Sequence, residues 1–95
     1  MNLGKAIKNV RKRKKLSQEE LARGAGITQA ALSQIENGKR PGTKTLNKIC
    51  TALEISESLI YVIGIEEEDV PKKNKVLYKK LFPVIQDLVL QIAME

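Results

Sequence analysis

The chain has 95 residues, of which 17 are Lys or Arg and 11 are Asp or Glu, so its net charge at pH 7 is +6 and a polyanionic partner is favoured. It contains no His and a single Cys, which excludes disulfide frameworks, zinc sites and His-based catalysis, and no cofactor is indicated. Only 3% of the residues are aromatic and no apolar run could span a membrane, so we expect a cytoplasmic protein that binds rather than catalyses.

The first helix carries apolar residues three and four positions apart: Leu3, Ile7 and Val10. Similar spacing recurs through residues 1–65, and no stretch alternates with period two, so the sequence predicts an all-α fold with five short helices in this part. The first helix ends in the basic run 11–15. In that run, Lys14 and Lys15 either clamp a phosphate or form a solvated helix end.

Two further helices and the turn between them form a helix-turn-helix. Ser17 and Glu20 have the spacing of a capping box, which predicts the start of the second helix. Gly26 can adopt the left-handed backbone that ends it, and Thr28 caps a third helix over residues 29–37.

The outward face of the third helix carries uncharged, short or amide side chains, whereas solvated helix faces usually carry Lys and Glu. Glutamine can pair with adenine through two hydrogen bonds, and an alanine methyl can contact a thymine methyl. We therefore interpret this face as a surface that reads base edges, in preference to an ordinary solvated face. Its members are Gln29, Ala30, Ser33 and Gln34.

The fourth and fifth helices complete the first 65 residues. Thr43 is the expected cap of the fourth helix and Ser56 opens the fifth, which Gly64 ends. Cys50 follows the apolar rhythm of the fourth helix, so we expect it in the core and not in a redox role.

The charge changes sign after residue 65. Residues 1–65 contain 12 Lys or Arg and 5 Asp or Glu (+7), whereas residues 66–95 contain 5 and 6 (−1). Residues 66–74, with four consecutive acids and Pro71, are predicted to be a linker. Their acids lack the alternating spacing of a calcium loop, so a solvated turn is favoured over a metal site.

Residues 75–95 form a helical extension in which Pro83 should produce a kink or start a new helix. Apolar residues cover about half of its circumference at 3.6 residues per turn. Leu90 lies outside that arc. The surplus over one buried face predicts a partner, either a second copy of the chain or a different protein. The residues assigned to this dimerisation face are Leu81, Val84, Ile85, Leu88, Val89 and Ile92.

Residues 3–64 resemble the Cro/C1-type, or Xre, family of helix-turn-helix proteins. The resemblance rests on three runs, Leu16–Ala22, Gly26–Gln29 and Leu32–Lys39. It implies a five-helix, lambda-repressor-like domain over residues 1–65 whose third helix enters the major groove of double-stranded DNA.

The resemblance also implies roles for single residues. Gln18 contacts a phosphate or supports the first reading residue, and Thr28 opens the reading face. A structural ion pair joins Arg11 to Glu36. The DNA backbone is met by the residues that follow the third helix: Asn37, Lys39 and Arg40.

Together these features predict a sequence-specific transcriptional regulator, a repressor acting as a homodimer on a palindromic operator. The alternative is an antitoxin or accessory protein that binds a partner protein through its C-terminal helix. No serine has a histidine to activate it, so an enzyme is not expected. RNA is disfavoured as a partner because the reading face suits a wide major groove.

Overall fold

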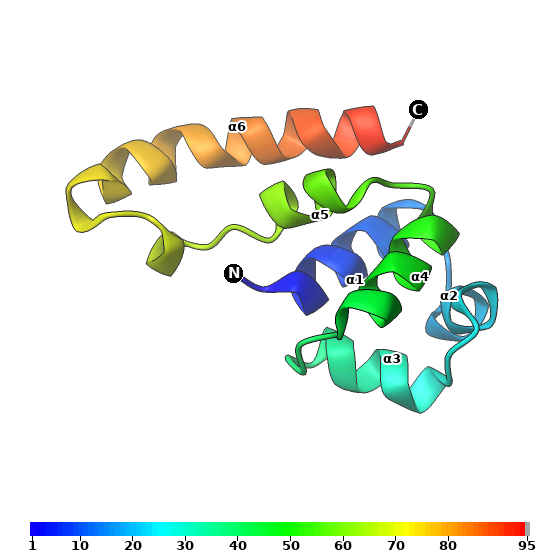
Figure 1. The fold of residues 1–95 in the computed structure, drawn as a ribbon. Helices are drawn as coiled ribbons and strands as arrows, with labels where there is room; N and C mark the ends of the chain where they lie inside the picture. Colours follow the sequence, from blue (N-terminus) through cyan, green and yellow to red (C-terminus); the bar gives the residue numbers. More distant parts are fainter. Residues whose placement is uncertain (95) are drawn as a thin grey trace.

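The computed structural model describes residues 1–94 and is helical throughout, with no strand in this range, as the sequence predicts (Figure 1). Two short 3-10 turns precede the last helix. The elements are α1 (Leu3–Arg13), α2 (Gln18–Ala25), α3 (Gln29–Glu36), α4 (Thr43–Leu53), α5 (Glu57–Ile63), η1 (Glu67–Asp69), η2 (Lys72–Asn74) and α6 (Lys75–Ala93).

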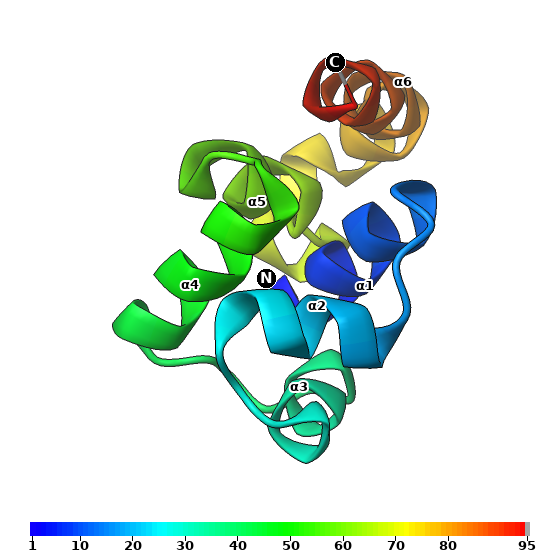
Figure 2. The same cartoon turned by 90° about the vertical axis from the view of Figure 1, so that its right-hand side faces the viewer.

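Helices α1 to α5 enclose one apolar core. α2 packs against α4, and α1 contacts both α3 and α5 (Figures 1 and 2). Cys50 is buried in this core, as the sequence predicts. The core holds α3 at one side of the molecule with only its inner face covered. The largest fully buried side chains are Ile7, Val10, Leu21, Leu32, Ile49, Leu53 and Ile60.

The predicted helix ends are confirmed except at the end of α3 and the start of α4. Ser17, Thr28 and Ser56 each accept a hydrogen bond from a backbone N–H in the first turn of the helix that follows. The expectation for Thr43 is wrong, because the extended backbone of Gly42 starts α4 and Thr43 is already its first helical residue. The helix α3 ends at Glu36, one residue earlier than predicted.

The helix α6 runs through Pro83 without a break, so the predicted start of a new helix at Pro83 is wrong. Proline removes an N–H donor and crowds the carbonyl of Lys79. Both residues are exposed, so this carbonyl can bond water instead. Hydrogen bonds from the face of α6 that packs on the rest of the chain also hold the helix in place on both sides of Pro83. The Tyr78 hydroxyl donates to the Ile65 carbonyl (3.2 Å), and the Gln86 amide donates to the Ile63 carbonyl (3.1 Å).

The inner face of α6 packs on α5 and joins the core, which corrects part of the predicted dimerisation face. Leu90 and Ala93 are buried, and Val89 is half-buried against the core. Val89 therefore faces its own chain, because it shares the helical face of Gln86, Leu90 and Ala93. The other five residues assigned to that face remain exposed: Leu81, Val84, Ile85, Leu88 and Ile92.

The segment between α5 and α6 is folded into η1 and η2 and is not a simple loop. Its acids make ion pairs: the amine of Met1 lies 2.5 Å from Asp69 and 3.4 Å from Glu66, and Lys79 lies 3.4 Å from Glu67. Within residues 1–94, no group of His, Cys, Asp and Glu could hold a metal ion. No helix in the same range is long and apolar enough to cross a membrane.

Candidate DNA-binding surface

The turn between α2 and α3 is fixed by local hydrogen bonds and one left-handed residue. The Glu20 amide donates to the Ser17 hydroxyl and the Ser17 amide donates to the Glu20 carboxylate, both at 3.0 Å. The second of these bonds lowers the pKa of Glu20 below its ordinary value. Gly26 ends α2 at a φ of 69°, where a side chain would be strained. The direction in which α3 leaves the turn is thereby set by the backbone.

The outward face of α3 presents amide and small side chains to solvent. Gln29, Ala30 and Gln34 are exposed and Ser33 is half-buried, whereas Leu32 is fully buried on the opposite side. Among residues 1–94, no hydrogen bond engages the side chains of Gln29, Ser33 or Gln34. Their donors and acceptors are therefore available to an external partner, and no charged side chain stands among them.

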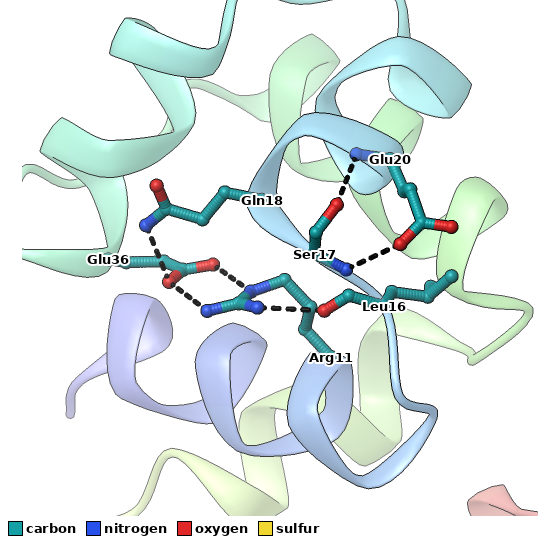
Figure 3. Close-up of polar contacts among 6 residues, drawn as sticks. All are labelled: Arg11, Leu16, Ser17, Gln18, Glu20 and Glu36. Carbon is teal, nitrogen blue, oxygen red and sulfur yellow. Dashed lines mark hydrogen bonds and ion pairs between the residues drawn. The ribbon is translucent and has the colours of Figure 1, made fainter.

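A buried polar cluster fastens α3 to α1 and to the start of α2 (Figure 3). Arg11 donates two hydrogen bonds to the Glu36 carboxylate, from Nε to Oε2 (2.8 Å) and from Nη2 to Oε1 (3.0 Å). Its Nη1 donates to the Leu16 carbonyl (2.8 Å), which closes the turn between α1 and α2. The Glu36 side chain is only 1% exposed, so this charge depends on Arg11 for its partner.

Gln18 belongs to the same cluster. Its Nε2 donates to Glu36 Oε1 at 3.1 Å, and no hydrogen bond joins it to Gln29 (Figure 3). The amide is half-buried at the start of α2, beside the end of α3. The structure therefore places Gln18 where it positions α3 through Glu36.

The segment after α3 carries the cations expected at a DNA backbone. Asn37, Lys39 and Arg40 are exposed, and Gly38 takes a φ of 119° that turns the chain away from α3. The Lys39 amide donates to the Gln34 carbonyl at 3.0 Å, which holds the segment against the helix end. The ion pairs formed within residues 1–94 include neither Lys39 nor Arg40.

The basic run at the end of α1 is divided among several roles. Neither alternative predicted for Lys14 describes it, because its ammonium donates to the Leu53 carbonyl at the end of α4, a position favoured by the helix dipole. Arg13 lies 3.7 Å from Asp87 of α6, and Lys12 and Lys15 remain exposed.

Gly4 allows α1 to pack closely against α3, a role that the sequence does not reveal. A Cβ built on it would lie 1.9 Å from the Ile35 carbonyl oxygen, so only glycine permits this approach of α1 to α3. A glycine in the first turn of a predicted helix is too weak a signal to identify such a contact. The partner lies 31 positions along the chain.

Comparison with known proteins agrees with this geometry. A family model described as helix-turn-helix matches residues 7–60. The ImmF control region 10 kDa protein of Bacillus phage phi105 is 38% identical over 65 residues, which cover 67% of this chain and 72% of that protein. The HTH-type transcriptional repressor RghR of Bacillus subtilis (strain 168) is 39% identical over 70 residues, which cover 70% of this chain and 52% of RghR.

A third relative matches more of the chain. The immunity repressor protein of Bacillus phage phi105 is 33% identical over 96 residues, covering 93% of this chain and 65% of that protein. A match of this extent necessarily includes most of α6. The chain spans about half the length of RghR and about two thirds of the immunity repressor. No solved structure gives a significant match.

The chain belongs to the Cro/C1-type helix-turn-helix family of DNA-binding proteins, as expected from the motif in residues 16–39.

Proposed function

We propose that the protein is a transcriptional repressor that binds a specific site on double-stranded DNA through α3 and acts as a homodimer on a palindromic operator. The observation that carries this proposal is the outward face of α3, where unpaired amides and small side chains stand on a helix of fixed direction. Relatives named as a transcriptional repressor and an immunity repressor support the regulatory role.

In this proposal α3 enters the major groove. Gln29 and Gln34 pair with base edges, Ala30 contacts a thymine methyl, and Ser33 supplies a hydroxyl. Thr28 caps the helix end that approaches the bases. Asn37, Lys39 and Arg40 hold the backbone and set the register of α3 without reading sequence. Occupancy of a promoter by the protein excludes polymerase, so repression needs no chemistry.

The homodimer is inferred from the outer stripe of α6. We use this name for the exposed apolar residues Leu77, Leu81, Val84, Ile85, Leu88 and Ile92, which are between 45% and 62% exposed. Four of them (77, 81, 84 and 88) alternate steps of four and three residues, the rhythm with which two helices pack along a seam. An apolar stripe of this length is typical of an interaction site.

The position of α6 leaves the outer stripe open to a partner while α3 binds DNA. The helix lies on the side of the molecule opposite α3 in both views (Figures 1 and 2). A partner seated on the outer stripe therefore leaves the reading face uncovered. A twofold dimer in which both copies of α3 contact one duplex multiplies affinity and requires two inverted half-sites about 10 base pairs apart, or a multiple of that.

Selection of bound sites from random duplex DNA tests the proposal directly. The full chain should enrich one sequence with inverted symmetry, and sedimentation at tens of micromolar should give a dimer. A monomer whose selected sites lack symmetry would overturn the homodimer and favour the accessory-protein alternative. No enrichment at all would overturn sequence-specific binding.

A further inference from the structure

A groove lined by cations follows α1 beside the C-terminal end of α3. Its larger part, about 590 Å³, contains the lysines of α1 and the residues that end α3. Its smaller part, about 140 Å³, contains Lys39 and Arg40. Asn2 and Gly38 line both parts, so the two adjoin, and we call them together the α1–α3 groove. The lysines that line it are Lys5, Lys8, Lys12 and Lys39.

The positive charge of the groove is not compensated within the described chain. Lys5, Lys8 and Lys12 are exposed, and the ion pairs formed among residues 1–94 include none of them. Glu36 is the one carboxylate that lines the groove. Its two oxygens already accept hydrogen bonds from Arg11. The groove therefore attracts anions along its whole length.

The spacing of these lysines suits a row of phosphates. Positions 5, 8 and 12 share one face of α1, and at 1.5 Å per residue they extend over about 10 Å. One strand of B-DNA carries a phosphate every 3.4 Å along the axis, so about three phosphates fit this length. The lysine ammonium is a flexible point charge that suits a phosphate. It lacks the planar pair of donors with which an arginine guanidinium forms two hydrogen bonds to one base.

We propose that the α1–α3 groove binds the sugar–phosphate backbone of duplex DNA next to the segment read by α3. This inference rests on the proposed function. It adds a contact outside the helix-turn-helix, contributed by Lys5, Lys8 and Lys12. The groove begins at Asn37 and Gly38, where α3 ends, so a strand leaving the reading surface meets the lysines directly. The contact increases affinity for every sequence and lengthens the footprint on DNA.

The test compares two triple variants of the full chain that remove the same charge. The test variant is Lys5→Gln, Lys8→Gln and Lys12→Gln. The control variant is Lys72→Gln, Lys73→Gln and Lys80→Gln, which changes exposed lysines of η2 and α6. Affinity is measured against salt concentration for the selected site, once with short ends and once with about five additional base pairs on each side. Circular dichroism and sedimentation confirm that both variants fold and assemble like the parent.

The test variant should reduce the slope of log affinity against log salt by about 2.7 for each copy bound, or about 5.4 for the dimer, at about 0.9 per phosphate, and lose several hundred-fold in affinity per copy at 0.1 M salt. Its base preferences should stay unchanged, and the additional base pairs should strengthen only the parent and the control variant. An equal slope for the parent and the test variant would overturn the inference while leaving the proposed function intact.

Two further outcomes are also decisive. If the test variant loses binding of inorganic tripolyphosphate but keeps the salt slope on DNA, the groove holds a small polyphosphate and the inference is wrong. If the parent binds no duplex, the proposed function and the inference fail together.

Discussion

Leu88 and Leu90 lie on opposite faces of α6. Substituting one residue at a time therefore tests the assembly of the protein and the stability of its monomer independently. Leu88 is 54% exposed on the outer stripe, whereas Leu90 is 2% exposed and belongs to the core. Leu88→Glu should therefore weaken the dimer and leave the monomer folded. Leu90→Ala should destabilise the monomer and leave the outer stripe unchanged.

The magnitudes follow from these exposures. Burial of a whole leucine side chain contributes about 1.5–3 kcal/mol, so burial of the exposed half of Leu88 contributes about 1 kcal/mol in each copy. Loss of both contributions raises the dimer dissociation constant about 30-fold, and the cost of desolvating two carboxylates adds to this. The free energy of unfolding of the Leu88→Glu monomer should change by less than about 0.5 kcal/mol. Leu90→Ala leaves a cavity and should cost about 2–5 kcal/mol.

Sedimentation equilibrium over a range of concentrations measures the first effect, and urea unfolding at a concentration below the dimer range measures the second. Equal sedimentation of Leu88→Glu and the parent would refute the outer stripe as the interface. A loss of monomer stability for Leu88→Glu as large as that for Leu90→Ala would refute the orientation of α6. Deletion after Val70 would combine both effects, because it removes the stripe and also uncovers the core.

Three more outcomes follow from the structure. Gln29→Ala and Gln34→Ala should each cost about 1–3 kcal/mol on the selected site and much less on random duplex, measured by competition binding; equal losses on both would mean that these residues only position the protein. Gly4→Ala should lower the urea midpoint strongly, because its Cβ would lie 1.9 Å from a backbone oxygen of α3, whereas Gly42→Ala, with nothing within 4 Å, should have a small effect. Similar midpoints for the two variants would contradict the close approach. Cys50 is 2% exposed and burial raises its pKa to about 11, so an alkylating reagent at pH 8 should modify it only after unfolding; rapid modification of the native protein would contradict its burial.

Features that depend on neighbouring residues could be predicted from the sequence. The capping box of Ser17 and Glu20, the left-handed Gly26 and the cap at Thr28 each involve residues within a turn of one another, so their spacing is sufficient. The outward face of α3 follows from helical periodicity once those ends are known. These features define the helix-turn-helix and the face that we propose reads bases.

Features that depend on distant partners could not be predicted in the same way. The approach of Gly4 to Ile35 and the bond from Lys14 to Leu53 join different helices, and nothing near either residue in the sequence indicates its partner. Pro83 illustrates the opposite error. A local rule predicts a break, but Lys79 and Pro83 are both exposed, so the carbonyl that Pro83 deprives of a donor can bond water, and the inner face of α6 holds the helix together.

The placement of α3 and α6 on opposite sides of the molecule has a consequence for how such proteins diversify. On the proposed function, substitutions at Gln29 or Gln34 change the operator and leave the choice of partner unaltered. Substitutions at Leu81 or Leu88 change the partner and leave the operator unaltered. Two descendants that retain one α6 but differ on α3 would form mixed pairs that recognise unlike half-sites. New regulatory circuits can therefore arise by changing one helix at a time.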